Sequence, residues 1–286
     1  MTPAYHTRCL LCDSADLRPM GKQYEHAYLV RCGSCGFVFG KRIPSQEELQ
    51  AHYVQYVRDN SISPITISRY EELLEAFEPY RKLNRILDIG CGDGHFLAVA
   101  KQKGWQVTGT EFTDEAVRVS RAKGIEIHQG PLQTLSTDQF DVITSFEVLE
   151  HINDGKEHVR KIHSLLREKG LFYFTTPNFN SASRRYLGGK WKVIEYPEHL
   201  VYYTVSTVTK LLNDAGFERR SIRTTGFSPQ RFRLSTGTAK REGNSDEPLR
   251  SAIETNAFLR LAKKIVNGIL VLFRSGDTLK GFFIKR

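Results

Sequence analysis

The sequence predicts an α/β protein in which a mostly parallel sheet carries helices on both faces, with a small cysteine-rich module in front of it. Three observations predict this fold class. Strand-like and helix-like segments alternate from residue 85 onward, a glycine-rich turn joins the first strand to its helix, and four cysteines form two C-x2-C pairs near the start. Such alternation is typical of βαβ units, and 286 residues suffice for one sizeable core plus a small module.

Composition and charge narrow the class of protein. Hydrophobic content of 40% and charged content of 26% exclude collagen-like, disordered and polytopic membrane classes. Residues 1–8 lack the apolar region of a signal peptide, and no stretch reaches the roughly 18 apolar residues of a membrane span, so we expect a cytoplasmic protein. The net charge of +9 indicates an anionic partner, such as nucleic acid, a phosphorylated substrate or a membrane surface, or a merely solvated basic surface.

The four paired cysteines, Cys9, Cys12, Cys32 and Cys35, predict a zinc ribbon over residues 1–42. Four thiolates from two knuckles close a tetrahedral Zn²⁺ shell, which leaves no open position and favours a structural metal. Short strands are expected at 28–31 and 37–39. Two disulfides are disfavoured in a cytosolic chain, and a redox C-x-x-C is disfavoured because neither pair opens a helix after a strand.

Residues 43–83 read as a helical linker between ribbon and core. Helical spacing runs over 45–57 and 67–83, Ser45 and Glu48 form an N-terminal capping signal, and Pro79 interrupts the second helix.

The main domain is expected over 84–286. Its first strands are predicted at 85–89, 106–110, 125–129, 140–145 and 170–176, and its helices at 94–103, 113–123 and 155–167. Ligands of such sheets bind at the carboxyl ends of the strands. Asp88, Glu111, Gly130 and Glu147 all lie at that edge.

The glycine-rich turn predicts a nucleotide site. Gly90, Gly92 and Gly94 let the backbone approach a cofactor closely, but their spacing lacks the later glycine of the dinucleotide pattern G-x-G-x-x-G. Glu111 ends the next strand, where a carboxylate can accept hydrogen bonds from both hydroxyls of a ribose.

Residues 87–94 (LDIGCGDG), then Glu111, then 140–143 (FDVI) leading into 147–151 (EVLEH), resemble the class I S-adenosylmethionine-dependent methyltransferases. The resemblance covers about 83–225 and implies a Rossmann-like, seven-stranded sheet with one antiparallel C-terminal strand at 277–285. It also implies that the three glycines line the methionine moiety, Asp88 supports its amino group, Glu111 holds the ribose and Phe112 lies against the adenine. The full set of expected cofactor residues is Asp88, Gly90, Cys91, Gly92, Gly94, Glu111, Phe112, Gly130, Pro131, Leu132, Phe146 and Glu147.

Glu147, Glu150 and His151 are spaced to share one face if the segment is helical, and His199 can join them from a distant loop. Carboxylates and imidazoles can hold Mg²⁺, Mn²⁺ or Zn²⁺. The pattern resembles metal-assisted O-methyltransferases of ubiquinone biosynthesis and small-RNA 2′-O-methyltransferases. The alternative needs no second metal: His151 or His199 acts as general base and Glu147 lines the cofactor pocket.

Two later segments bear on the acceptor. Residues 179–200 are predicted to be an irregular substrate lid whose Arg, Tyr and Trp side chains suit sugar, nucleotide or phosphate recognition, or else a solvated loop with a packed Trp191. A helix at 204–215 and a strand at 217–225 follow. Residues 227–273 form an insertion of loop and amphipathic helix; the helix, within 252–273, either packs over the acceptor site or makes a peripheral contact with an anionic membrane.

The sequence therefore predicts an enzyme that transfers a methyl group from S-adenosylmethionine to an oxygen of a small-molecule, sugar or polysaccharide-precursor acceptor. A ribbon before this core resembles bacterial enzymes of sugar, polysaccharide and secondary-metabolite tailoring. The alternative is an RNA 2′-O-methyltransferase or other nucleic-acid methyltransferase that grips its substrate with the ribbon.

Overall fold

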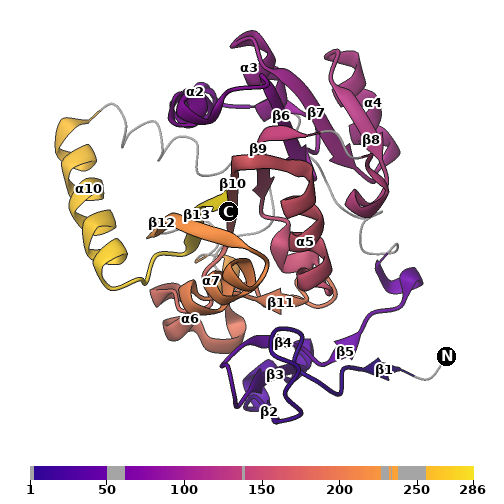
Figure 1. The fold of residues 1–286 in the computed structure, drawn as a ribbon. Coiled ribbons are helices and arrows are strands. Elements are labelled where there is room, and N and C mark those ends of the chain that lie inside the picture. Colours follow the sequence, from indigo (N-terminus) through magenta and orange to yellow (C-terminus); the bar gives the residue numbers. More distant parts are fainter. Residues whose placement is uncertain (1–2, 50–61, 137–138, 227–231, 233, 238–255) are drawn as a thin grey trace.

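The computed structural model describes residues 3–49, 62–136, 139–226, 232, 234–237 and 256–286 (Figure 1). Its main feature is a seven-stranded sheet of order β12-β13-β10-β9-β6-β7-β8. The strands are β6 Arg85–Ile89, β7 Gln106–Glu111, β8 Glu126–Gln129, β9 Phe140–Phe146, β10 Leu166–Pro177, β12 Phe217–Thr225 and β13 Thr278–Lys285. Strands β8, β7, β6, β9 and β10 pair in parallel, whereas β13 runs antiparallel to β10 and β12. The predicted seven-stranded sheet with one antiparallel strand is confirmed.

Helices cover both faces of this sheet. One layer contains α2 Pro64–Phe77, α3 His95–Gln102 and α4 Asp114–Ala122, and the other contains α5 Gly155–Leu165 and α7 Val205–Asp214. Neighbouring strand residues point to opposite faces. Accordingly Ile86 packs with the first layer and Leu87 with the second, and both are fully buried.

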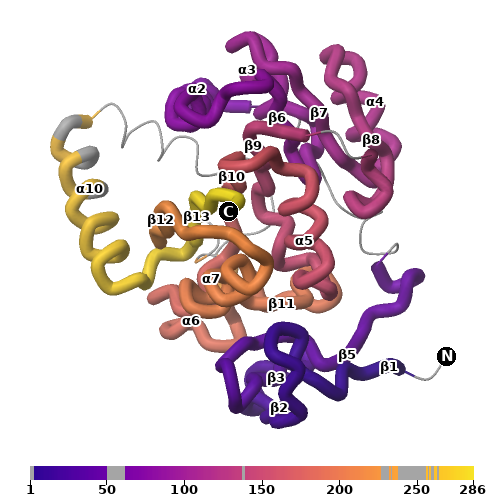
Figure 2. Tube along the Cα trace, viewed as in Figure 1, coloured from indigo at the N-terminus to yellow at the C-terminus, as the bar shows by residue number. Residues whose placement is uncertain are grey.

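The cysteine-rich module forms a separate sheet that the main domain completes (Figure 2). Its strands are β2 Leu17–Pro19, β3 Leu29–Cys32 and β4 Val38–Gly40, and the fourth strand, β11 Val201–Tyr202, comes from the main domain. The expected strands at 28–31 and 37–39 are present, each displaced by one residue. A hairpin-like pair, β1 Ala4–Tyr5 with β5 Arg42–Ile43, lies beside them.

The segment between module and sheet begins with the predicted cap. Glu48 N donates to Ser45 Oγ (3.2 Å) and Ser45 N donates to Glu48 Oε2 (3.0 Å), which is a reciprocal capping box. Residues 46–49 are helical, and the rest of the expected helix at 45–57 lies mostly outside the described residues. Helix α2 starts at Pro64, and Pro79 lies in the 3₁₀ turn η2 Glu78–Tyr80 that follows it.

Three expectations about elements were wrong. The helix predicted at 155–167 ends at Leu165, and β10 begins at once, because Leu166 already pairs with Phe140 of β9; the register then shifts between Leu166 and Leu171. Residues 179–200 are not irregular throughout: Ser181 caps the helix α6 Ala182–Leu187, and the 3₁₀ turn η5 Gly188–Lys190 follows.

The third concerns the amphipathic helix, α10 Ala257–Leu272. Its expected packing over the acceptor site was wrong, whereas its alternative placement on a membrane stays a prediction. Figure 1 shows α10 at the edge of the molecule beside β12. Its apolar face is exposed, with Phe258 at 75% and Leu272 at 76%. The described part of α10 thus buries no apolar face over the main sheet.

Candidate active site

The glycine turn joins β6 to α3 at the carboxyl edge of the sheet. Gly90, Gly92 and Gly94 all have positive φ, at 66°, 53° and 70°. A Cβ on Gly94 would lie 2.6 Å from the Ile125 side chain, so this glycine is required by packing. A Cβ on Gly92 would meet nothing within 4 Å. The space beside Gly92 is therefore open, unlike the space beside Gly94.

Glu111 connects the turn to the end of β7. Its Oε2 accepts from Gly92 N at 3.0 Å, and its Oε1 accepts from Phe112 N at 2.9 Å and Thr113 N at 3.0 Å. The carboxylate predicted to hold a ribose therefore lies directly against the glycine turn. Cys91 packs as a small filler, because its Sγ would lie 2.6 Å from a Cβ on Gly109.

Asp88 lies beneath the turn and is 3% exposed. Thr144 Oγ1 donates to its Oδ1 at 2.7 Å. Burial, reinforced by the negative charge of Glu111, raises the pKa of Asp88 to about 7 although the hydrogen bond from Thr144 opposes the shift. A cationic group placed here would lower this pKa again, which suits the ammonium of a methionine moiety.

The residues expected around an adenine differ in exposure. Phe112 is 66% exposed at the rim, while Leu132 is buried in the turn η3 Leu132–Thr134. Gly130 N donates to Glu111 O (3.1 Å), and Pro131 follows directly. An exposed ring at this edge is available to cover a flat ligand.

An aromatic group at the same edge includes residues that sequence reasoning missed. Phe146 contacts Phe96 and Tyr173 with ring centroids 5.0 and 5.7 Å apart, and Tyr70 from α2 joins Phe96 at 5.3 Å. Burial, with Asp88 as the second cause, raises the pKa of Tyr70 to about 12. Helix α2 thus brings a phenol near the cofactor residues. The only available signal was the helical spacing around Tyr70, which says nothing of its partner.

The structure brings together three of the four residues predicted as a second metal or base site. Ligand atoms of Glu150, His151 and His199 all lie within 4.8 Å of one another, and the two imidazole centroids are 4.8 Å apart. Thr176 Oγ1 donates to Glu150 Oε2 at 2.9 Å. Glu150 is only 2% exposed, so its carboxylate is held rigidly.

The expectation that Glu147, Glu150 and His151 share a helical face was wrong. Only a single 3₁₀ turn, η4 Leu149–His151, follows β9, and Glu147 has the left-handed φ of 53°. Glu147 N donates to Thr175 O at 3.0 Å. The side chain of Glu147 is not part of the three-residue group, although its charge acts on both His151 and Tyr173. Left-handed φ at a non-glycine residue is strained and is enriched at functional sites.

Both histidines are held in one tautomer by backbone carbonyls. His151 Nδ1 donates to Glu198 O at 2.5 Å, and His199 Nδ1 donates to Val193 O at 2.6 Å. Because a carbonyl can only accept, each ring carries a hydrogen on Nδ1, which in a neutral imidazole leaves the lone pair on Nε2. Burial lowers the pKa of His151 below its usual value, so this imidazole is neutral near pH 7. Histidines oriented in this way are typical of metal ligands and of general bases.

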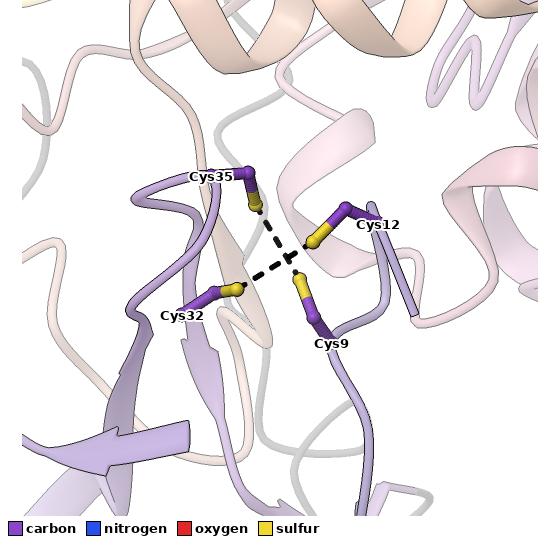
Figure 3. Close-up of side chains that lie close together, drawn as sticks. All are labelled: Cys9, Cys12, Cys32 and Cys35. Atoms are coloured by element: carbon purple, nitrogen blue, oxygen red, sulfur yellow. Dashed lines mark hydrogen bonds between the residues drawn. The ribbon is translucent and has the colours of Figure 1, made fainter. Parts of the chain in front are cut away.

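The four cysteines of the module converge on one point, as Figure 3 shows. The Sγ atoms of Cys9 and Cys35 are 3.6 Å apart, those of Cys12 and Cys32 are 3.5 Å apart, and all four lie within 4.8 Å. These separations are far above a disulfide bond of about 2.05 Å and fit the edges of a tetrahedron around one ion with Zn–S bonds of about 2.3 Å. Leu11 N donates to Cys9 Sγ (3.4 Å), as expected in a thiolate knuckle. The residues present therefore fit a Zn²⁺ ion.

The sheet, with its glycine turn, defines the class of protein as an S-adenosylmethionine-dependent methyltransferase. Residues 62–222, more than half of the chain, match the family described as "Methyltransferase domain", and the chain belongs to that family.

Two curated relatives illustrate the sequence similarity. The ubiquinone biosynthesis O-methyltransferase of Bordetella avium is 27% identical over 199 residues, which are 63% of this chain and 80% of that protein. The protein of the same name from Idiomarina loihiensis is 32% identical over 108 residues, which are 35% of this chain and 44% of that protein.

Solved structures share the fold. A SAM-dependent methyltransferase from Archaeoglobus fulgidus gives a TM-score of 0.53 at 18% identity, covering 84% of this chain and all of that one. Phosphoethanolamine N-methyltransferase 2 of Haemonchus contortus, solved with S-adenosylmethionine, gives 0.54 at 17% identity and covers 87% of this chain and 62% of that one.

Proposed function

We propose that this enzyme methylates a hydroxyl oxygen of a small-molecule, sugar or polysaccharide-precursor acceptor. The observation that carries the proposal is the group of Glu150, His151 and His199, whose imidazoles both donate through Nδ1 to backbone carbonyls. Transfer to oxygen needs a group that removes or attracts the hydroxyl proton. The names of the relatives, ubiquinone biosynthesis O-methyltransferases, support oxygen as the acceptor atom.

The cofactor half of the site would hold S-adenosylmethionine in place. The sulfonium of S-adenosylmethionine supplies an activated methyl group, which transfers by in-line displacement. Gly92 gives it room, Asp88 provides negative charge for the ammonium, and Glu111 is available for the ribose after exchanging some of its present backbone partners. Phe112, Pro131 and Leu132 would border the adenine, and Phe146 and Glu147 the methionine side. The protein's contribution to rate is then mostly alignment of the acceptor oxygen with the methyl carbon.

The acceptor half supports two ways of handling the proton. A divalent ion held by Glu150, His151 and His199 would attract the acceptor oxygens and lower the pKa of the hydroxyl. In the other, His151 Nε2 takes the proton while Glu198 O, which accepts from Nδ1, stabilises the resulting imidazolium. Both use the same side chains, and metal analysis separates them.

We also propose that Cys9, Cys12, Cys32 and Cys35 hold a structural Zn²⁺, on the strength of their four converging sulfur atoms. A nucleic-acid acceptor is the second candidate for function, favoured by the net charge of +9. Steep loss of RNA affinity with salt would support it.

A membrane contact through α10 extends the proposal to lipid-linked acceptors. No helix among the described residues is both long and apolar enough to cross a bilayer. The apolar side chains of α10 are exposed, and so are the cationic side chains of Lys264, Arg274 and, on the adjacent β12, Arg219 and Arg223. Because these charges repel a second copy of the chain, an anionic lipid surface is the occupant that complements them.

One experiment tests the acceptor atom and the metal together. Purified protein is analysed by native mass spectrometry and for bound metals, before and after chelation, and is then given labelled S-adenosylmethionine with catechol, sugar and RNA acceptors. We expect one tightly held zinc per chain and label on a hydroxyl oxygen of a small acceptor. Glu150→Gln should lower turnover at least tenfold with unchanged cofactor affinity. Label on nitrogen or carbon, or transfer to RNA alone, would refute the proposal.

A further inference from the structure

We propose that the zinc ribbon is a positioning device for the acceptor half of the active site, acting through the segment 188–202 that carries His199. The ribbon would hold this imidazole in its Nδ1–H tautomer while leaving the cofactor half unaffected. The inference rests on the proposed role of His199 in methyl transfer, but the coupling itself can be measured without any acceptor or second metal.

The orientation of His199 depends on its own segment. Its Nδ1 donates to Val193 O at 2.6 Å, so the ring follows the position of the backbone at residue 193. The next residue, Leu200, donates its N–H to Glu150 O at 2.9 Å, which joins the segment to η4. A displacement of the backbone at 193 would therefore strain or break the hydrogen bond that orients this imidazole.

The ribbon holds that backbone by side-chain packing. Trp191, Val193 and Ile194 are each less than 5% exposed and share a cluster with residues of the ribbon. The ribbon members of this cluster are Tyr24, Ala27, Leu29 and Val38. In addition His26, in the 3₁₀ helix η1 Lys22–Ala27, donates through Nε2 to Ile194 O at 3.1 Å. The segment that was expected to be an irregular substrate lid is thus anchored on its ribbon side.

A second link runs through the small sheet. Strand β11 starts two residues after His199 and pairs antiparallel with β4, with Val201 opposite Phe39. Gly40 N also donates to Leu200 O at 2.8 Å. Strand β4 pairs in turn with β3, which ends at Cys32. A continuous ladder therefore connects a predicted zinc ligand to the residues next to His199.

Two glycines make the contact between ribbon and segment possible. A Cβ on Gly189 would lie 1.7 Å from the backbone oxygen of Gln23, and one on Gly188 would lie 2.1 Å from Gln23 Oε1. Gly189 N also donates to Gln23 Oε1 at 3.2 Å. No side chain larger than hydrogen fits at 189 unless η1 and η5 separate. The added methyl group of Gly189→Ala should therefore push the ribbon and the segment 188–202 apart at this point.

The cofactor half is built from different contacts. At the β6, β7 and β9 edge, Gly92 N donates to Glu111 Oε2, and Thr144 Oγ1 donates to Asp88 Oδ1. The Gly189→Ala substitution should leave these hydrogen bonds intact. The proposal therefore predicts damage to His199 without damage to cofactor binding.

The experiment compares Gly189→Ala with Gly21→Ala in the full-length, zinc-loaded protein. Gly21 stands just before η1, and its added Cβ would meet nothing within 4 Å, so it is a matched control. Three quantities are measured: the affinity for S-adenosylhomocysteine by calorimetry, deuterium uptake over 190–202 by mass spectrometry, and the imidazole nitrogen shifts of His199 by NMR. The His199 signals are assigned from their loss in His199→Gln.

We expect Gly189→Ala to bind S-adenosylhomocysteine within twofold of the wild type. Its uptake over 190–202 should be at least fivefold faster, and the His199 nitrogens should move from the Nδ1–H tautomer to an averaged mixture. Gly21→Ala should match the wild type in all three. His26→Ala, a milder change, should shift uptake and tautomer in the same direction to a smaller extent.

Unchanged uptake and tautomer in both Gly189→Ala and His26→Ala would overturn the proposal. So would a parallel loss of cofactor affinity, because the ribbon would then support the whole fold rather than this segment. Failure of the proposed function looks different: the tautomer shift would occur, yet His199→Gln would leave methyl transfer unchanged.

Discussion

At the scale of single residues, the site combines strain with buried charge. Glu147 and Gly92 adopt left-handed φ, and Asp88 and Glu150 keep carboxyl groups almost out of contact with water. Such features cost stability and are kept when a ligand uses them. Substitutions at these residues should therefore affect the free energy of unfolding and the affinity for the ligand to different extents.

Asp88→Asn should change how stability depends on pH. The folded pKa of about 7 lies above the ordinary value of 3.8, so between these values the folded state keeps a proton that the unfolded chain releases. This carboxyl's contribution is thus fully present below pH 3.8 and is lost as the pH rises through about 7. The unfolding free energy, measured with urea, should fall more between pH 5 and pH 8 for the wild type than for Asp88→Asn. An equal pH dependence in both would contradict the buried carboxyl, and the variant should also bind S-adenosylmethionine more weakly.

Gly92→Ala should weaken cofactor binding at little cost in stability. The new methyl group enters the open space of the turn, and the left-handed backbone adds about 1 kcal/mol of strain. We expect at least a tenfold lower affinity for S-adenosylhomocysteine by calorimetry. Gly226→Ala is the matched control, because Gly226 also has positive φ, 83°, and open space around its Cβ. Equal affinities in the two variants would exclude Gly92 from the cofactor site.

At the scale of elements, we expect the cysteine-rich module to depend on a bound metal. Its own strands are only three or four residues long, and its core residues Cys9, Leu11 and Phe37 merge with the main core that includes Tyr203 and Leu211. So small a module folds stably only with an additional cross-link. Lys156 of α5, whose Nζ lies 2.5 Å from Asp13 Oδ2, adds one ion pair across the same boundary.

Cys12→Ser should abolish zinc binding and unfold the ribbon. The zinc content measured by metal analysis should fall from one ion per chain to nearly none, because three thiolates and a hydroxyl hold the ion far less tightly. Amide exchange over 29–40 should approach that of an unfolded chain, whereas that of 85–89 should stay slow. Ser34→Ala, which removes a hydroxyl group between Cys32 and Cys35 of the second knuckle, serves as control. Retained zinc in Cys12→Ser would refute the four-cysteine site.

At the scale of the whole molecule, exposed apolar and cationic side chains are concentrated at the edge formed by α10 and β12. Figure 1 shows α10 standing beside β12 and away from the ribbon. The exposed apolar side chains of α10 are Phe258, Leu261, Ile265, Val266, Ile269 and Leu272. Together with the exposed arginines of β12, they present a surface that suits the interface of an anionic bilayer.

The wild-type protein should therefore sediment with vesicles that contain one third phosphatidylglycerol, and much less with purely zwitterionic vesicles. Ile265→Ser with Ile269→Ser should reduce the bound fraction at least fivefold, because both side chains are more than half exposed. The variant should keep the wild-type affinity for S-adenosylhomocysteine. A dimer in solution that these substitutions dissociate would instead assign the face to a second copy of the chain.

Local patterns of the sequence were sufficient for much of this molecule. The seven-stranded sheet with its antiparallel last strand was implied by the resemblance to the methyltransferase family. The alternation of strands and helices, the glycine turn next to Glu111, and the convergence of four cysteines follow from periodicity and spacing over short ranges. These features are decided by neighbouring residues, because backbone conformation, strand alternation and ligand spacing are local properties.

Only the tertiary structure decided the rest. It brought His199 to Glu150 and His151 over some fifty residues of chain, replaced the expected helical face at Glu147 by a strained turn, and set Tyr70 beside Asp88. It also joined β11 to the ribbon, which turned an expected lid into an anchored segment. Such contacts depend on how distant surfaces pack against each other, and no periodicity within one segment records which partner lies opposite.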